Sequence, residues 1–160
     1  MKKLLVLSDS HGAKETMLRI VRLEQPDLIC HLGDYIRDCE WLREQVSGIP
    51  VFGVVGNCDY RSEGSDQILT SVEGVRIFAC HGHAYHVKFS LMSLRYAAME
   101  QNAALCLFGH THSPYLLELD GLTLLNPGSC GGTAPCYATV SLADGKAVCS
   151  LKRLPDQKED

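Results

Sequence analysis

Short apolar runs in this chain end repeatedly in side chains that can bind a metal. Six of the seven histidines lie at or near such ends, a distribution that scattered surface histidines would not give. Imidazoles, carboxylates and an amide together suit a hard or borderline divalent metal. The polar positions that follow the five runs are Asp9, His11, His31, Asp34, Asn57, Asp59, His81, His83, His110 and His112. We therefore predict that these segments meet at a metal site.

Such a set of ligands fits a pair of cations that together catalyse hydrolysis of a phosphoester. Two divalent ions about 3.5–4 Å apart need one bridging ligand, and a carboxylate has two oxygens for this purpose. Neutral imidazoles add affinity without cancelling the positive charge that must polarise a phosphoryl oxygen. A water shared by both ions loses a proton near neutral pH, because its pKa falls to about 7. The expected nucleophile is this bridging hydroxide, so no serine, cysteine or histidine needs to attack.

Each motif taken singly has a plainer explanation. Asp9 and its neighbours could form a polar turn at a strand end, and Asp34 could cap a helix or close a turn. Residues 56–59 could form a simple loop. His110 and His112 carry more weight, since two imidazoles two residues apart at a strand end seldom serve packing. The joint pattern is what indicates a shared site.

Buried strands with helices between them must position these residues. The five runs, at 4–7, 28–30, 51–55, 75–80 and 104–108, have the length and composition of buried strands. If they are parallel and adjacent, their carboxyl ends meet along one sheet edge. The chain opens as βαβαβ and its second half adds too many strands for one sheet, so we expect two mixed sheets packed face to face with helices outside. The expected helices are 14–24, 39–46 and 90–101, the expected hairpins pair 67–72 with 75–80, 114–119 with 122–125 and 137–142 with 147–151, and 60–65 reads as a loop.

The bulk properties are those of an ordinary globular protein. With 160 residues, of which 46% are apolar and 21% charged, we expect one domain over 1–154 and a short polar tail over 155–160. The net charge of −4 and the lack of a basic block argue against a non-specific nucleic-acid surface. No apolar stretch approaches the roughly 18 residues of a membrane span, and the first run is too short for a signal peptide.

The eight cysteines predict reduced thiols in a cytoplasmic protein. No C-x-x-C pair is present, which argues against a structural zinc knuckle. Several cysteines fall inside expected strands, where this residue packs as a small hydrophobe. Without a secretory signal, disulfides are not expected.

The ordered motifs D-x-H, G-D, G-N-C-D, H-G-H and G-H-x-H closely resemble those of the calcineurin-like metallophosphoesterase superfamily. The match runs from Leu4 to Leu151. The short length, the GNCD form and the stretch 126–129 resemble the small YfcE-like phosphodiesterases of bacteria and archaea. The resemblance implies a four-layer α/β/β/α sandwich, in agreement with the strand count.

The resemblance also implies how the ligands divide between two metals. The first metal would be held by Asp9, His11 and His112, the second by Asn57, His81 and His110, and Asp34 would bridge them. Manganese is common in such families, while nickel, iron, cobalt or zinc can substitute. The ligand types agree with this range of metals. Because most sites of this kind bind divalent metals in the same order of affinity, the sequence does not identify which metal is bound.

Cys58 is the departure from the family pattern. Many phosphomonoesterases of the superfamily carry histidine there, paired with the acidic residue that follows, to stabilise or protonate the leaving group. A thiol is only a weak donor, so the substitution favours a phosphodiester, or leaves proton donation to His83 or water. Asn57 could touch a substrate oxygen, and Asp59 could mainly orient the loop. The plainer alternative is that Cys58 only packs at the loop. The candidate catalytic residues are Asn57, Cys58, Asp59 and His83.

The expected function is hydrolysis of a small phosphodiester, with phosphomonoesterase activity as the alternative. A different class is a protein-binding scaffold like the retromer subunit that shares this fold; competent side chains at all seven ligand positions argue against it. A nuclease would need a basic channel, which the sequence lacks. The specificity loops are expected at 60–65 and 83–89, and hairpin edges could pair in a homo-oligomer. The natural substrate cannot be read from these loops.

Overall fold

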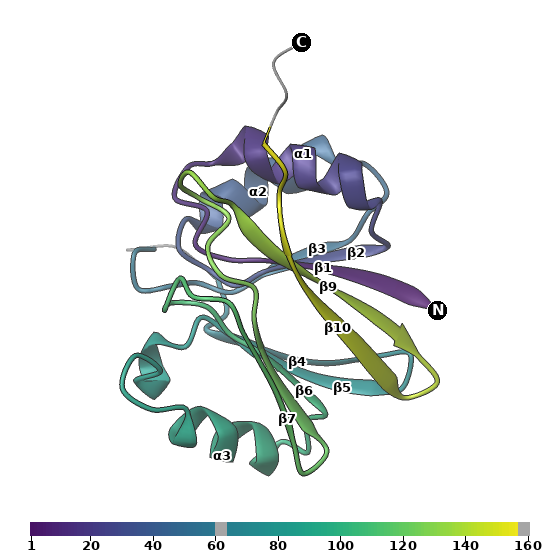
Figure 1. Cartoon of the computed structure of the whole chain (residues 1–160), viewed down its shortest axis with the longest axis vertical. Coiled ribbons are helices and arrows are strands. Elements are labelled where there is room, and N and C mark those ends of the chain that lie inside the picture. The colour runs from purple at the N-terminus through teal and green to yellow at the C-terminus, as the bar shows by residue number, and fades with distance from the viewer. Residues whose placement is uncertain (60–63, 157–160) are drawn as a thin grey trace.

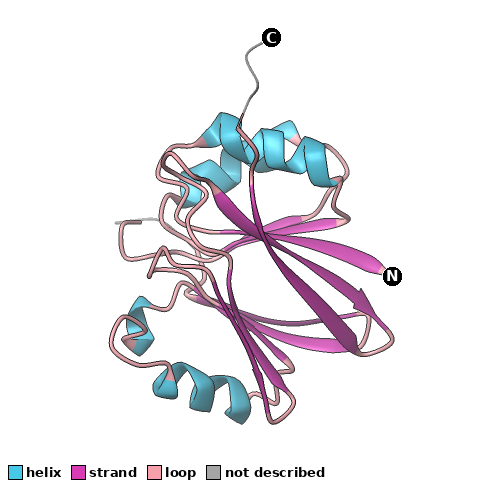
Figure 2. Cartoon of the chain, viewed as in Figure 1, coloured by secondary structure: helices cyan, strands magenta, loops and turns pink. Residues whose placement is uncertain are grey.

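Two five-stranded sheets pack face to face in the computed structural model, and helices cover their outer faces (Figures 1 and 2). The structure describes residues 1–59 and 64–156. The helices are α1 (Lys14–Glu24), α2 (Ile36–Gln45) and α3 (Met92–Glu100), with a 3₁₀ turn η1 (His83–Tyr85). The strands are β1 (Lys2–Leu7), β2 (Leu28–His31), β3 (Val51–Gly53), β4 (Gln67–Val72), β5 (Val75–Cys80), β6 (Leu105–Leu107), β7 (Tyr115–Leu119), β8 (Leu122–Asn126), β9 (Cys136–Ala143) and β10 (Lys146–Arg153). The order of layers is the predicted α/β/β/α.

The first sheet has the order β10-β9-β1-β2-β3, with β1, β2 and β3 parallel. Successive side chains of a strand point to opposite faces, and β1 is apolar on both. Leu4 and Val6 face the core between the sheets, whereas Leu5 and Leu7 pack with Met17 of α1 in the core under the helices. Burial of both faces explains why this strand is a continuous apolar run.

The second sheet has the order β4-β5-β6-β8-β7, with β5, β6 and β8 parallel. Its inner face contributes Ile77, Ala79 and Leu107 to the core between the sheets. Its outer face packs Phe78 and Cys106 with residues of α3. The expected hairpin of 67–72 with 75–80 has the predicted strand bounds.

The five apolar runs divide between the two expected sheets, so the condition that all five are adjacent in one sheet is not met: three form strands of the first sheet, and the runs at 75–80 and 104–108 form strands of the second. One expected helix needs correction. Helix α2 begins at Ile36 rather than at 39, because the Ile36 N–H donates to Asp59 Oδ1 at 2.8 Å and extends the helix by a turn. That contact joins residues far apart in sequence, so local periodicity does not reveal it. Helix α3 is a little shorter than expected, whereas α1 has the predicted bounds.

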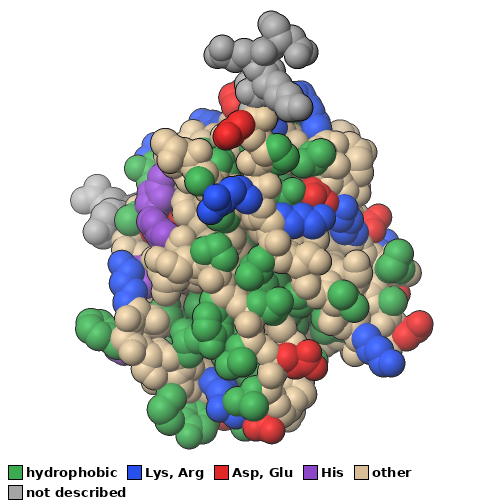
Figure 3. Space-filling model, in the orientation of Figure 1, with side chains coloured by type: hydrophobic (Ala, Val, Ile, Leu, Met, Phe, Trp, Pro, Cys, Tyr) green, Lys and Arg blue, Asp and Glu red, His purple; other side chains and the backbone are tan. Residues whose placement is uncertain are grey.

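The carboxyl ends of the parallel strands of both sheets point to the same side of the sandwich, where the long loops gather (left side of Figure 2). Histidine side chains reach the surface at that edge (Figure 3). All eight cysteines lie in the described part of the chain and are free thiols. No helix of the described residues is long and apolar enough to cross a membrane. The edge strands β7 and β10 carry exposed apolar side chains, and pairing of such edges between copies of the chain stays a prediction. Of the expected loop at 60–65, residues 60–63 lie outside the described residues.

Candidate metal centre

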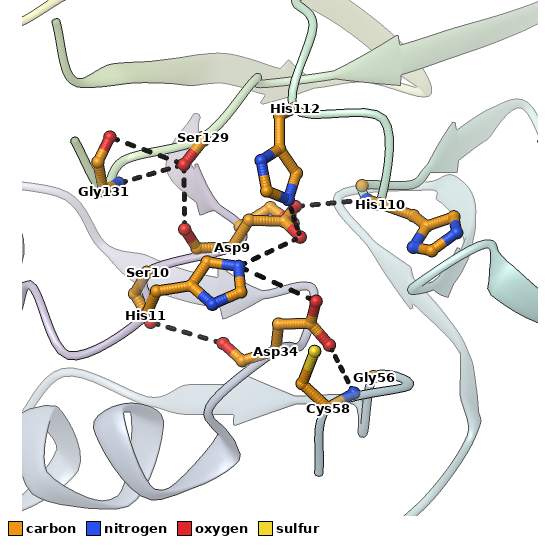
Figure 4. Close-up of polar contacts among 12 residues, drawn as sticks. Asp9, Ser10, His11, Asp34, Gly56, Cys58, His110, His112, Ser129 and Gly131 are labelled. Atoms are coloured by element: carbon orange, nitrogen blue, oxygen red, sulfur yellow. Dashed lines mark hydrogen bonds and ion pairs between the residues drawn. The ribbon is translucent and has the colours of Figure 1, made fainter. Parts of the chain in front are cut away.

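Asp9 lies two residues beyond β1 and is completely buried. Its Oδ2 accepts hydrogen bonds from the Ser8 hydroxyl at 2.5 Å and from the His110 N–H at 3.1 Å. Its Oδ1 has no hydrogen-bond donor among the described residues. Instead Oδ1 faces imidazole Nε2 atoms, at 3.1 Å from His112 and 4.0 Å from His11 (Figure 4). The Nε2 of His81 lies 3.8 Å from the same oxygen. A buried carboxylate oxygen without a donor is costly, and a bound cation would remove that cost.

Asp34 follows β2 and lies between two groups of histidines. Its Oδ2 is 3.8 Å from His11 Nε2 on one side and 3.4 Å from His81 Nε2 on the other. Its Oδ1 accepts from the Cys58 N–H at 2.9 Å. Burial opposes ionisation of this carboxyl, but the His81 contact and the Cys58 N–H outweigh it and hold the pKa well below its usual range. Asp34 is therefore an ionised carboxylate placed to face two sites at once.

His81 follows β5 and is completely buried. Its Nδ1–H donates to the Leu32 carbonyl at 2.7 Å, so Nε2 is the nitrogen that a metal would contact. That Nε2 lies 3.0 Å from Asn57 Oδ1 and 3.2 Å from His110 Nδ1. Burial lowers the pKa of His81, but Asp34 and Asp9 more than compensate and raise it above 6.5. Burial and the charge on His81 lower the pKa of His110, which favours the neutral form that a metal needs.

These side chains form two groups with the spacing of metal ligands. Within each group one nitrogen or carboxylate oxygen per residue lies within 4.8 Å of the others. The first group is Asp9, His11, Asp34 and His112, and the second is Asp34, His81 and His110. The geometry brings together all seven predicted ligands, since Asn57 Oδ1 reaches the second group through His81. The donor set, with Asp34 in both groups, fits two divalent cations.

The backbone at this site is strained. Asp9, His11, Asp34, His110 and His112 all have positive φ, between 44° and 71°. A non-glycine residue in this region costs roughly 1–3 kcal/mol, and such residues cluster at functional sites. The rest of the fold must supply the stabilisation that keeps these side chains pointing at one another.

Close packing of the backbone against candidate ligands requires glycine at two positions. A Cβ on Gly56 would collide with Asp34 Oδ1, and a Cβ on Gly109 would collide with the Ser8 hydroxyl and lie 2.9 Å from Asp9 Oδ2. The backbone at both positions packs directly against a candidate ligand. No side chain larger than hydrogen fits there without moving that carboxylate.

The predicted catalytic residues have different surroundings. Asp59 Oδ1 accepts from the Ile36 N–H and Oδ2 from the Gly56 N–H, both at 2.8 Å, so this residue orients the loop. Cys58 is exposed beside Asp34, and burial and the Asp34 charge raise the pKa of its thiol. The His83 ring centroid lies 5.5 Å from that of His81. Burial and the charge on His81 lower the pKa of His83.

Sequence reasoning missed a buried hydrogen-bond chain behind the first group of ligands. Ser10 Oγ donates to Asp38 Oδ2 at 2.7 Å, and the Gly12 N–H donates to the same oxygen at 2.7 Å. His31 Nδ1 accepts from the Gly33 N–H at 3.2 Å, so its Nε2–H can donate to Ser10 Oγ at 2.9 Å. Burial lowers the pKa of His31 to about 4, and the ring stays neutral. This chain holds both flanks of His11. Its sequence signals were His31 after a strand-like run and a carboxylate four residues beyond Asp34.

Asn126 was also missed as a residue of the site. Its buried amide donates to the Gly109 carbonyl at 3.1 Å and to Thr111 Oγ1 at 3.0 Å, and its Oδ1 accepts from the Gly128 N–H. Ser129 Oγ donates to the Asp9 carbonyl at 2.9 Å (Figure 4). The segment 126–129 therefore supports the loops that carry Asp9, His110 and His112.

The sequence and fold both have relatives. The family model described as "Calcineurin-like phosphoesterase superfamily domain" matches residues 1–145. The chain is 33% identical over 128 residues to a probable metallophosphoesterase, YsnB, of Bacillus subtilis, covering 78% of this chain and 73% of the relative. It is 21% identical over 159 residues to a protein of Methanocaldococcus jannaschii named a phosphodiesterase, covering 89% of this chain and 92% of that protein.

Among solved structures, a predicted phosphoesterase of Streptococcus pneumoniae superposes with a TM-score of 0.81 and 29% identity, covering 95% of this chain and 89% of that one. Wild-type Vps29 of Entamoeba histolytica, solved with Zn²⁺, gives a TM-score of 0.77 at 17% identity, covering 94% of this chain and 98% of that one. Similarity at that identity establishes a shared fold only.

Proposed function

The chain belongs to the calcineurin-like phosphoesterase superfamily, and from its site we propose that it is a phosphodiesterase that uses two divalent cations. The observation that carries this proposal is the position of Asp34, whose carboxylate faces both groups of ligands. The unsatisfied Oδ1 of buried Asp9 supports a cation on the first side. The name of the phosphodiesterase relative supports the reaction class.

The seven residues divide as their contacts suggest. Asp9, His11 and His112 would hold one cation, Asn57, His81 and His110 the other, and Asp34 would bridge them. When bound, such a pair supplies a water of lowered pKa and polarises the phosphoryl oxygen. Manganese is our first choice, and nickel, iron, cobalt or zinc suit the same ligands.

The protein's own groups orient the reaction. His81 is locked by its Nδ1–H bond to the Leu32 carbonyl, so its Nε2 keeps one direction. The Asn57 amide, whose oxygen points to His81, has its NH₂ group free to contact a phosphoryl oxygen; apart from a 3.7 Å contact to the Cys58 sulfur, the described residues give it no partner. Asp59 fixes the turn that carries both Asn57 and Cys58.

Cys58 favours a diester as the substrate. Its thiol, with a raised pKa, is a weak proton donor and cannot act as the imidazolium that a poor leaving group needs. A diester with a good leaving group depends less on such a donor. Phosphomonoesterase activity is the second candidate, favoured by the position of His83 beside His81, where its imidazole N–H could donate a hydrogen bond to a leaving group.

The test is hydrolysis of bis(p-nitrophenyl) phosphate with manganese, compared with p-nitrophenyl phosphate. Asp34→Asn and His110→Ala should each reduce kcat/KM by at least about a hundredfold. Asp144→Asn, at the exposed β9–β10 turn far from the ligands in sequence, is the matched control and should keep the wild-type kcat/KM.

Unchanged activity in both site variants would refute the assignment of the site. A higher kcat/KM for the monoester than for the diester would show that the protein is a phosphomonoesterase. Absence of turnover on any phosphoester, together with a partner retained equally by wild type and Asp34→Asn, would favour a protein-binding scaffold.

A further inference from the structure

Two cavities adjoin the candidate metal centre, one beside each group of ligands. The larger, of about 480 Å³, is lined by His81, His83, Ala84, Tyr85, Asp66 and Gln67 among others; we call it the His83 pocket. The smaller, of about 360 Å³, is lined by His11, His112, Ser129, Gly131, Gly132 and Ala134 among others; we call it the Gly132 pocket. Both volumes lie within the range of roughly 300–1,000 Å³ usual for small-molecule sites.

The two pockets lie on different sides of the centre. They share no lining residue. The Gly132 pocket includes His11 and His112 of the first group, whereas the His83 pocket includes His81 of the second. In Figure 4, Ser129 and Gly131 lie on the opposite side of Asp9 from His110. A phosphorus atom held between the two groups would therefore have one cavity on each side.

This arrangement matches the shape of a diester better than that of a monoester. A phosphodiester carries two organic groups, which leave the phosphorus in different directions. A monoester carries one and would leave one cavity without a function. A cavity on each side of the centre gives each organic group of a diester its own place.

The linings of the two pockets differ in chemistry. The His83 pocket is lined by Asp66, whose side chain is exposed, and by His83. In the same pocket Gln67 Oε1 accepts from the Tyr85 hydroxyl at 3.1 Å. This side offers a negative charge and acceptor oxygens, which suit an organic group with hydroxyl or ammonium donors.

The Gly132 pocket offers no carboxylate, lysine or arginine among its described lining residues. Gly132 has a φ of +83°, and no heavy atom lies within 4 Å of the place where its Cβ would be. Apart from the candidate ligands His11 and His112, its lining consists of small residues. Such a surface suits an uncharged group rather than a donor-rich one.

We propose that the centre acts on an asymmetric phosphodiester, with a group bearing hydroxyl or ammonium donors in the His83 pocket and an uncharged group in the Gly132 pocket. This inference rests on the proposed phosphodiesterase function. Asp66 is the residue that selects the donor-bearing group. It contacts substrate and none of the candidate ligands, so its removal should affect recognition and not metal loading.

The first experiment fills each pocket separately, with Ala84→Leu in one and Ala134→Leu in the other. Both alanines are exposed, so the added atoms should enter the cavity and not the core. Each variant should lower kcat/KM for bis(p-nitrophenyl) phosphate about tenfold, whereas at most one of them should affect p-nitrophenyl phosphate. Manganese binding by calorimetry should equal that of wild type in both. If neither variant changes diester hydrolysis, or if both slow the monoester equally, the two-pocket arrangement is wrong.

The second experiment tests Asp66 with three p-nitrophenyl diesters whose other group is ethyl, 2-hydroxyethyl or 2-aminoethyl. Wild type should prefer at least one donor-bearing ester over the ethyl ester, and Asp66→Asn should remove that preference through KM at unchanged kcat. Asp144→Asn is the control and should keep the preference. The donor-bearing ester whose KM rises more in Asp66→Asn shows whether the recognised donor is a hydroxyl or an ammonium group. A wild type without preference, or a preference that survives in Asp66→Asn, overturns the inference.

Failure of the proposed phosphodiesterase function and failure of the pocket assignment give different results in these experiments. If manganese-loaded wild type hydrolyses none of these diesters, the proposed function fails. If it hydrolyses them but the pocket variants do not discriminate among them, the proposed function stands and the pocket assignment fails.

Discussion

Asp38 should be required for the stability of the first group of ligands, although it contacts no ligand side chain. The perturbation is Asp38→Ala. In the wild type a single buried oxygen, Asp38 Oδ2, accepts from the Ser10 hydroxyl and the Gly12 N–H, both at 2.7 Å. Leaving the buried Ser10 hydroxyl unpaired costs about 1–3 kcal/mol, whereas the Gly12 N–H, whose bond is only part-buried, adds little because water can replace the carboxylate. Ser10 can turn toward the Asp34 carbonyl at 3.5 Å, so we expect the lower half of that range.

The assay has two readouts on metal-free protein. Urea unfolding should show the loss of stability, and calorimetric titration with manganese should show affinity about 10–100-fold weaker, as for other residues that support metal ligands. Asp38→Asn keeps an acceptor and should lose less of both, whereas Asp144→Asn, at an exposed turn with positive φ that Asn also adopts, should lose neither. If Asp38→Ala keeps the wild-type unfolding midpoint and manganese affinity, the proposed role of the buried chain is wrong.

Three further predictions concern other parts of the molecule. Burial of the Glu24 carboxyl opposes ionisation, but hydrogen bonds from Lys3, Tyr137 and Lys152 outweigh it and lower its pKa from 4.5 to about 2. Glu24→Gln should therefore lower the free energy of urea unfolding at pH 7 by roughly 2–3 kcal/mol. The difference from wild type should vanish as the pH falls from 4.5 through 2, where Glu24 becomes protonated. Equal stabilities at pH 7 would contradict it. Gly109→Ala should push Asp9 away and weaken manganese binding at least about tenfold by calorimetry, and unchanged binding would refute the close packing. Cys58→His should raise kcat for p-nitrophenyl phosphate more than for bis(p-nitrophenyl) phosphate. An equal change for both substrates would show that residue 58 does not affect departure of the leaving group.

The strands and the candidate ligands were predictable because their signals are local. The continuous apolar run of β1 reflects burial on both faces, and the change from apolar to polar at Asp9 marks the carboxyl end of that strand. The hairpin of β4 and β5 was predictable because a glycine turn separates two strand-like runs. In these places neighbouring residues carry the information.

The supporting residues were not predictable, because their roles depend on contacts across the fold. Asp38 has the position of an ordinary acidic residue in the first turn of a helix, yet it is 1% exposed since Ser10 and Gly12 pack against it. Asn126 ends a strand of the second sheet and secures a loop that begins after another strand. The division of the apolar runs between two sheets likewise follows from packing that no single segment encodes.

The central claim, a pair of cations bridged by Asp34, is tested most directly by electron paramagnetic resonance of the manganese-loaded protein with the metal content measured on the same sample. The account predicts two manganese ions per chain with an exchange-coupled spectrum, and loss of that coupling in Asp34→Asn but not in Asp144→Asn. One ion per chain at saturation, or two ions with uncoupled spectra in the wild type, would contradict it.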